Sequence, residues 1–137
     1  MKRALCVGIN NYPGTDSDLY GCVNDMLDWS YLLKNAFGFS VKTLQNENAT
    51  KQNIEGELAD DLLHTTNEDV YVFTFSGHGS FIPDKDGDEP DGVDEVLVPY
   101  DFNKGFIVDD TLNKLLSSVA NGTVVFISDC CHSGTVS

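Results

Sequence analysis

Two side chains of this sequence have the chemistry of a nucleophile and its base. His78 and Cys131 each follow a run of apolar residues, and about 50 residues separate them. A cysteine thiolate attacks carbonyl carbons well, but it needs a base to take its proton and donors to hold the oxyanion that forms. Glycines flank His78 on both sides and would let backbone amides approach a substrate closely. The pair is therefore a candidate for nucleophilic attack on a carbonyl carbon.

The other cysteines and histidines fit these two roles less well. His132 adjoins Cys131, and neighbouring side chains usually point apart, so His132 is a poor base for that thiol. His64 falls late in an expected helix and is interpreted as structural. Cys6 lies in the first expected strand and is assigned to the core. Cys130 could be the nucleophile on spacing alone, and the residues by themselves leave that alternative open.

Strands that alternate with helices should position these residues. Apolar runs and helical periodicity predict strands at 3–9, 40–44, 70–75 and 124–128, helices at 23–37, 51–62 and about 110–116, and short extended pieces at 95–99 and 105–108. Thr50 is the expected N-cap of the second helix, and Asp109 or Asp110 that of the third. This order predicts an α/β fold, in which helices cover both faces of a mostly parallel sheet. In such sheets the chemistry lies past the carboxyl ends of strands, where His78 and Cys131 fall.

The net charge of the chain limits which kinds of partner it can bind. The 137 residues include 22 acidic and 8 basic side chains, which gives a net charge of −14. A phosphate backbone would be repelled, so we expect no nucleic acid partner, and metal ions or Lys/Arg-bearing peptides are favoured instead. No apolar run reaches the ~20 residues of a membrane span, and no signal peptide is recognised, so we expect a cytoplasmic protein without membrane contact. The four cysteines lack the spacing of a zinc site.

Three segments together resemble the catalytic motifs of metacaspases and orthocaspases, which are caspase-type cysteine peptidases. The segments are Gly21–Asp25, Ser76–Gly79 and Asp129–Gly134. Taken singly, a histidine in a loop or a cysteine at a strand end is unremarkable, but the joint order and spacing favour the family. The resemblance implies a caspase-like three-layer sandwich. Residues 1–137 would be its large p20-type domain, and a small p10-type portion would lie outside this sequence.

The resemblance also assigns roles to single residues. It makes Cys131 the nucleophile, His78 the general base, and the amides of Gly79 and Cys131 the oxyanion hole. It places four residues around the substrate side chain that precedes the scissile bond: Cys22, Asp25, Ser76 and Asp129.

An acidic specificity pocket follows from the same assignment. Cleavage after Asp would require a cationic pocket, and Arg3 is the only arginine of the chain. Two carboxylates would instead favour Arg or Lys in the substrate. The alternative is that Asp25 is an exposed helix residue and that Asp129 caps the catalytic loop.

The acidic loop before residue 95 suggests a metal ion. Its carboxylates resemble those of a calcium loop, but Glu89 stands where an EF-hand needs glycine. The resemblance implies a different, activating Ca²⁺ site at Asp94, Asp109 and Asp110, with a further ligand beyond Ser137. The alternative is a solvated loop followed by a helix start that favours acidic residues through its dipole.

The expected function is therefore a calcium-stimulated cysteine endopeptidase that cleaves peptides or proteins after Arg or Lys. We expect the p10-like subunit or C-terminal half to be needed for robust activity. Lys85 and Lys104, in expected loops, are conceivable sites of autoprocessing. The alternative is a catalytically silent caspase-fold subunit that binds calcium or acts as a scaffold, although the presence of both His78 and Cys131 argues against it.

Overall fold

The computed structural model describes residues 1–83, 93–119 and 122–131, with only the main chain at 93 and 131. The elements in chain order are β1 (Lys2–Gly8), α1 (Cys22–Phe37), β2 (Ser40–Gln45), α2 (Lys51–Leu63), β3 (Val70–Pro83), β4 (Val93–Leu97), β5 (Ile107–Val108), α3 (Asp109–Ser117) and β6 (Thr123–Cys131). Single 3₁₀ turns cover Asn46–Asn48 and Phe102–Lys104. Among the described helices, none has both the length and the apolar character needed to cross a bilayer.

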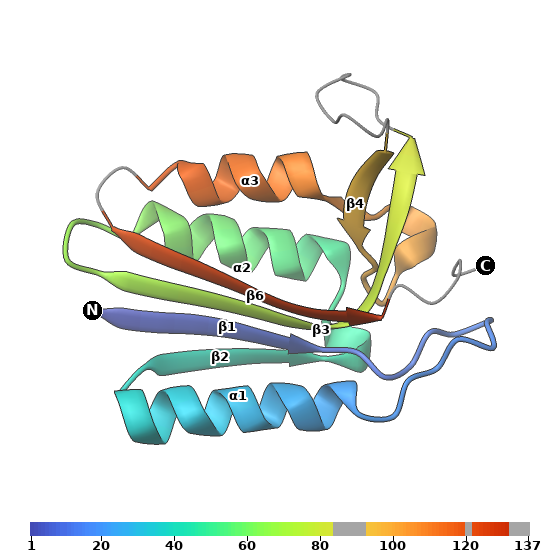
Figure 1. Cartoon of the computed structure of the whole chain (residues 1–137), viewed down its shortest axis with the longest axis horizontal. Coiled ribbons are helices and arrows are strands. Elements are labelled where there is room, and N and C mark those ends of the chain that lie inside the picture. Colours follow the sequence, from blue (N-terminus) through green and yellow to red (C-terminus); the bar gives the residue numbers. More distant parts are fainter. Residues whose placement is uncertain (84–92, 120–121, 132–137) are drawn as a thin grey trace.

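A parallel sheet forms the centre of the molecule (Figure 1). Its strands lie in the order β2, β1, β3, β6, and each neighbouring pair is parallel. The far end of β3 leaves this sheet and pairs antiparallel with β4, which pairs antiparallel with β5. The expected mostly parallel sheet is confirmed, and the antiparallel extension makes it a mixed one.

Helices cover both faces of the sheet, as the alternating order predicts (Figure 1). On one face, α1 packs against β1 and β3 through a cluster that includes Ala4, Cys6, Met26, Leu33 and Val72. On the other face, α2 and α3 cover a larger cluster that includes Leu5, Val7, Ile54, Leu58, Phe73 and Leu112. Successive residues of β1 alternate between the two clusters, as the period of two along a strand requires. The three-layer arrangement is therefore confirmed.

The two strands that carry the candidate dyad are longer than their apolar runs predict. The prediction ended the third strand at Phe75, but β3 runs to Pro83 and contains His78. Its polar end stays extended because β6 pairs with it as far as His78 and β4 pairs with it from Gly79 onward. The last strand likewise reaches Cys131. Backbone hydrogen bonds to neighbouring strands keep these ends extended, and the hydrophobic pattern of the sequence gives no sign of such bonds.

The predicted N-cap residue is confirmed for α2 but not for α3. Thr50 is the N-cap of α2, and its Oγ1 accepts a hydrogen bond from the amide of Asn53 at 3.1 Å, so that prediction is confirmed. The prediction for α3 was wrong, because Val108 occupies the N-cap position and makes no side-chain capping bond. Since β5 runs directly into α3, Asp109 and Asp110 fall within its first turn, where the helix dipole still favours them.

Gly8 at the end of β1 lets α1 lie close to the sheet. A Cβ atom there would lie 2.7 Å from the carbonyl oxygen of Cys22 and 2.7 Å from Cβ of Met26, both in α1. We expect Gly8→Ala to lower the free energy of unfolding by about 1–3 kcal/mol, since α1 must move away from the strand. Urea denaturation measures this change.

The control for that substitution is Gly56→Ala in α2. No atom lies within 4 Å of the Cβ that it would add. We expect Gly56→Ala to raise stability by about 0.5–1 kcal/mol through helix propensity. Equal stability of Gly8→Ala and the wild type would contradict the close approach of α1.

Candidate active site

The structure places His78 and Cys131 at paired positions of adjacent strands. β3 and β6 run parallel, and their register pairs His78 with Cys131. Neighbouring strands lie about 4.8 Å apart, so residues distant in the sequence meet at one end of the sheet. The same register pairs Ser76 with Asp129. Two candidate pocket residues therefore lie two positions before the candidate dyad.

A main-chain carbonyl orients the imidazole of His78. His78 is only 4% exposed, and its Nε2 donates a hydrogen bond to the carbonyl oxygen of Ser17 at 2.5 Å. Because a carbonyl oxygen only accepts, Nε2 carries the hydrogen, and Nδ1 bears the lone pair of the neutral ring. A base oriented by a third group is typical of nucleophile–base pairs. Sequence reasoning missed Ser17, since a carbonyl oxygen leaves no residue-type signal.

A buried tyrosine also contacts this histidine. The ring centroids of Tyr12 and His78 lie 4.7 Å apart, and Tyr12 is fully buried. Its hydroxyl accepts a hydrogen bond from the amide of His78 at 2.8 Å. Sequence reasoning missed Tyr12 as well, because a single aromatic residue in a loop rich in Asn, Pro and Gly carries no chemical pattern.

Gly79 lies where β3 passes from one sheet partner to the next. It is buried, follows His78 directly, and pairs with Leu97 of β4. The amides of Gly79 and Cys131, the expected oxyanion donors, therefore belong to adjacent strand ends.

Two carboxylates of the expected pocket lie together. Asp25 from α1 and Asp129 from β6 line an open cavity of about 250 Å³. Desolvation raises the pKa of Asp25, and so do the charge of Asp129, a hydrogen bond with it and the charge of Asp28. A cation in this cavity would relieve the repulsion, and a guanidinium could bind two carboxylates at once.

The other two expected pocket residues do not line this cavity. Cys22 and Ser76 are 6% and 1% exposed. Cys22 begins α1, where its amide donates to the side-chain oxygen of Asn10 at 2.9 Å. Ser76 lies in β3 beside Asp129. The structure thus brings two of the four residues into the cavity and places the other two in the buried layer of their strand and helix.

The remaining lining residues were missed by sequence reasoning. They are Asp28, Trp29 and Leu32. With Asp25 they follow the spacing i, i+3, i+4, i+7, which is one face of a helix. That spacing was visible in the sequence and could have extended the expected pocket along α1.

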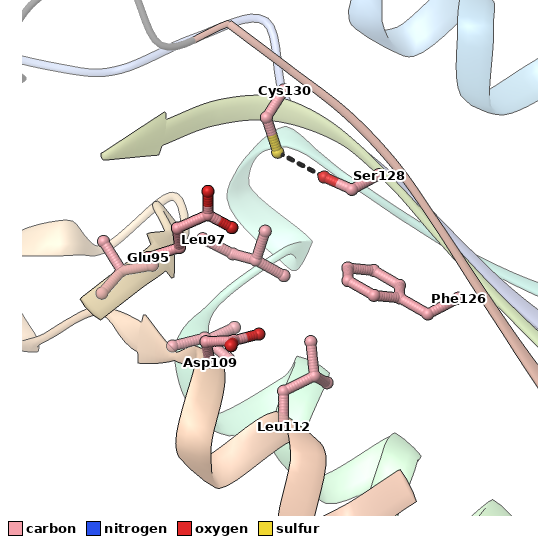
Figure 2. A pocket seen from close by; sticks show the side chains of 9 residues that line it. Glu95, Leu97, Asp109, Leu112, Phe126, Ser128 and Cys130 are labelled. Carbon is pink, nitrogen blue, oxygen red and sulfur yellow. Dashed lines mark hydrogen bonds between the residues drawn. The ribbon is translucent and has the colours of Figure 1, made fainter. Parts of the chain in front are cut away.

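Cys130 lies in a different cavity from the two carboxylates. It lines a space of about 70 Å³ between β4, β5, α3 and β6, with its Sγ 2.8 Å from Oγ of Ser128 (Figure 2). This space borders the cluster beneath α2 and α3, whereas Asp25 belongs to α1 on the opposite face. In the strand register Cys130 pairs with Gly77 and not with His78. The geometry therefore favours Cys131 over Cys130 as the nucleophile.

Cys6 and His64 have structural surroundings, as expected. Cys6 is fully buried in β1, and burial raises the pKa of its thiol, which disfavours a reactive thiolate. His64 ends α2, where its Nδ1 hydrogen bonds with the carbonyl oxygen of Asp60 at 2.8 Å.

The predicted calcium ligands do not form a complete site within the described ranges. No group of three or more His, Cys, Asp or Glu side chains that could hold a metal ion is found there. Asp94 is buried in β4, and Asp110 lies in the first turn of α3. Asp109 and Glu95 line the small cavity of Figure 2, whose other walls are largely apolar and suit a hard cation poorly. The described residues do not fit calcium by themselves. The acidic segment 84–92, with Lys85, lies outside them.

The chain resembles known proteins over nearly all of its length. The family model described as "Metacaspase, peptidase C14 domain" matches residues 2–137. Metacaspase-1 of Meyerozyma guilliermondii is 39% identical over 98% of this chain and 35% of that protein. Metacaspase-4 of Arabidopsis thaliana is 39% identical over 97% of this chain and 34% of that protein. The chain thus spans about a third of the length of these curated relatives.

A solved structure has the same architecture. The crystal structure of protein GSU0716 from Geobacter sulfurreducens matches with a TM-score of 0.82 and 35% identity. The match covers 98% of this chain and 52% of that one. The likeness extends to the whole mixed sheet and its flanking helices.

We expect Asp25→Asn to stabilise the protein at neutral pH. The pKa of Asp25 is raised in the folded state, so folding favours its protonated form and its ionisation weakens the fold. This penalty is present above the raised pKa and vanishes below the ordinary carboxyl pKa of the unfolded chain. The melting temperature of the variant should exceed that of the wild type at pH 7 and equal it near pH 3.

Asp16→Asn provides the control for this comparison. Asp16 is exposed and does not line the cavity. Its replacement should leave the melting temperature unchanged at both pH values. A lower melting temperature of Asp25→Asn at pH 7 would show that Asp25 stabilises the fold and would contradict the repulsion.

Proposed function

Because the chain belongs to the metacaspase family of C14 cysteine peptidases, we propose that it carries the catalytic dyad of an endopeptidase that cleaves after Arg or Lys. Its caspase-like fold is a mixed sheet flanked by helices. The observation that carries the proposal is the pairing of His78 with Cys131 on adjacent parallel strands.

The proposed mechanism is acyl transfer through Cys131. Nδ1 of His78 accepts the thiol proton, and the thiolate attacks the scissile carbonyl carbon. The amides of Gly79 and Cys131 hold the oxyanion. His78 then protonates the leaving amine, and a water molecule that gives up a proton to His78 hydrolyses the acyl-enzyme. Throughout, the Ser17 carbonyl accepts the Nε2 hydrogen and stabilises the imidazolium, as the third member of a triad does.

The acidic cavity supports the proposed specificity. Desolvation raises the pKa of Asp25, and Asp129 lies close enough for its charge to raise that pKa further. Asp129 precedes Cys131 by two residues in β6, which supports a pocket next to the proposed dyad. A substrate Arg or Lys would bring the positive charge that this cavity lacks, whereas a substrate Asp would add to the repulsion.

We further propose that a C-terminal half or a p10-like subunit completes the sheet beside β6. In the part of the chain that the structure describes, β3 is the only strand that pairs with β6, so the other edge of β6 has no described strand beside it. Such an edge is a template for another strand. The relatives are about three times as long as this chain, which leaves ample sequence for that role.

The full-length protein should hydrolyse reporter peptides that end in Arg or Lys and spare those that end in Asp. His78→Ala should lower kcat by about 10²–10⁴-fold through loss of the base, and Cys131→Ala should abolish turnover. Initial rates measure both effects, with Cys130→Ala as the matched control that retains activity. Cleavage after Asp would refute the acidic pocket. No cleavage of any peptide by a folded protein would favour the silent-subunit alternative.

We propose separately that calcium stimulates the full-length enzyme through Asp94, Asp109 and Asp110. Support comes from the match of these positions to the family pattern and from the pairing of β4 with β5, which brings the two segments side by side. Added Ca²⁺ should raise both the initial rate and the melting temperature, because a ligand that binds only the folded state stabilises it.

The calcium effects should be weaker in Asp110→Asn and unchanged in the exposed control Asp16→Asn. Mg²⁺ at the same concentration is the ion control. If Ca²⁺ changed neither the rate nor the melting temperature of the wild type, the proposed site would be excluded.

A further inference from the structure

The hydroxyl of Tyr12 takes the place of a sheet strand beside His78. β1 pairs with β3 only as far as the contact between Gly8 and Ser76. Two residues further along β3, the amide of His78 donates to Oη of Tyr12 at 2.8 Å. Tyr12 lies in the segment that follows β1. Its side chain therefore bonds to β3 just beyond the point where β1 stops pairing with that strand.

The same hydroxyl joins His78 to Val98, the residue directly after β4. Oη of Tyr12 donates to the carbonyl oxygen of Val98 at 3.1 Å, and the amide of Val98 donates to the carbonyl oxygen of His78 at 3.0 Å. The three groups form a closed ring of hydrogen bonds around the main chain of His78. Both main-chain polar groups of the candidate base are thereby fixed from outside β3.

The ring of Tyr12 limits where the imidazole can lie. Its centroid is 4.7 Å from that of His78 with the planes inclined by 57°, a tilted aromatic contact. The Ser17 carbonyl holds Nε2 of the same imidazole. His78 is therefore held at its main chain, by a ring contact with Tyr12 and at one ring nitrogen. A positive charge on the imidazole would also face the π-electrons of Tyr12 at a favourable distance.

The surrounding residues are arranged to keep Tyr12 in place. Its amide donates to Oδ1 of Asp18 at 2.7 Å, and its carbonyl oxygen accepts the hydroxyl of Thr15 at 2.7 Å. A Cβ atom at Gly77 would lie 2.8 Å from Oη of Tyr12. Glycine before His78 is thus required by the approach of the tyrosine hydroxyl, a reason different from the substrate access that the sequence suggested.

We propose that Tyr12 is a positioning residue for the general base. It holds His78 at the place and orientation from which Nδ1 can exchange a proton with Cys131. This role rests on the function proposed above, because it concerns the same dyad. The proposal gives Tyr12 no direct role at the thiol or the substrate, and its effect passes through His78.

The test compares two buried tyrosines of the full-length protein. Tyr12→Phe removes the hydroxyl that bridges His78 and Val98. Tyr71→Phe removes a hydroxyl that is also fully buried and donates to Oδ2 of Asp61 at 2.9 Å, seven residues before His78 in the same strand. Both variants should melt at a lower temperature than the wild type, because Tyr12→Phe loses two buried hydrogen bonds and Tyr71→Phe loses one.

Only Tyr12→Phe should slow the chemistry. With an Arg reporter peptide, and with rates expressed per titrated active site, its kcat should fall about tenfold while KM changes less than about twofold. Tyr71→Phe should keep both constants. If the kcat of Tyr12→Phe matched that of Tyr71→Phe, the hydroxyl would be structural only and the proposal would be overturned.

A second measurement separates this proposal from the peptidase function. The rate at which iodoacetamide alkylates Cys131, followed by mass spectrometry in a Cys130→Ser background, reports proton transfer to His78 without any substrate. Slower alkylation in Tyr12→Phe supports the positioning role even if the wild type cleaves no peptide. Absence of cleavage by the wild type would refute the proposed function alone. Equal alkylation beside normal cleavage would overturn the positioning role alone.

A second variant replaces Tyr12→Phe if that protein does not fold. Asp18→Ala removes the acceptor of the Tyr12 amide from an exposed position. It should lower kcat and the alkylation rate in the same direction, and a protein with unchanged kcat and alkylation would count against the role of Tyr12.

Discussion

The long strand β3 is the constraint on which the rest of the site depends. Its first part is the centre of a parallel sheet between β1 and β6, and its last part is one side of an antiparallel hairpin. His78 lies at the change of partner. On one side the strand register fixes Cys131 beside it, and on the other the end of β1 leaves an opening that Tyr12 fills. The position of this candidate base is thus set by backbone hydrogen bonds, which are local, directional and costly to leave unmade when buried.

The sequence predicted the architecture well because hydrophobic patterns decide it. Residues 70–75 and 124–128 are nearly continuous apolar runs, as expected for strands covered on both faces, and helical periodicity between them implies a parallel sheet. The strand ends were predicted less well. Ser76, His78 and Asp129 are polar, so no hydrophobic signal marks them as strand, although neighbouring strands keep them extended. The prediction that Asp109 or Asp110 is the N-cap of α3 was wrong because β5 runs straight into α3, so Val108 occupies the N-cap position.

The site was predictable only where residue types carry the chemistry. His78, Cys131 and the carboxylates of Asp25 and Asp129 could be named from their types and from the family resemblance. The Ser17 carbonyl could not, because every residue has one, and which carbonyl meets the imidazole depends on the path of the segment after β1. Tyr12 belongs to the same group, since its role follows from where a neighbouring strand stops.

The acidic cavity has a consequence for the end of a catalytic cycle. Hydrolysis after Arg or Lys generates a new carboxylate on the very residue whose cationic side chain would occupy the cavity of Asp25 and Asp129. Before cleavage that residue brings only a positive charge, and afterwards it brings a negative one as well. Desolvation and the charge of Asp129 raise the pKa of Asp25, and the negative charges of the cavity would then repel the product too. A cavity of like charges would therefore hold the intact chain more tightly than the fragment made from it, which favours turnover over product inhibition.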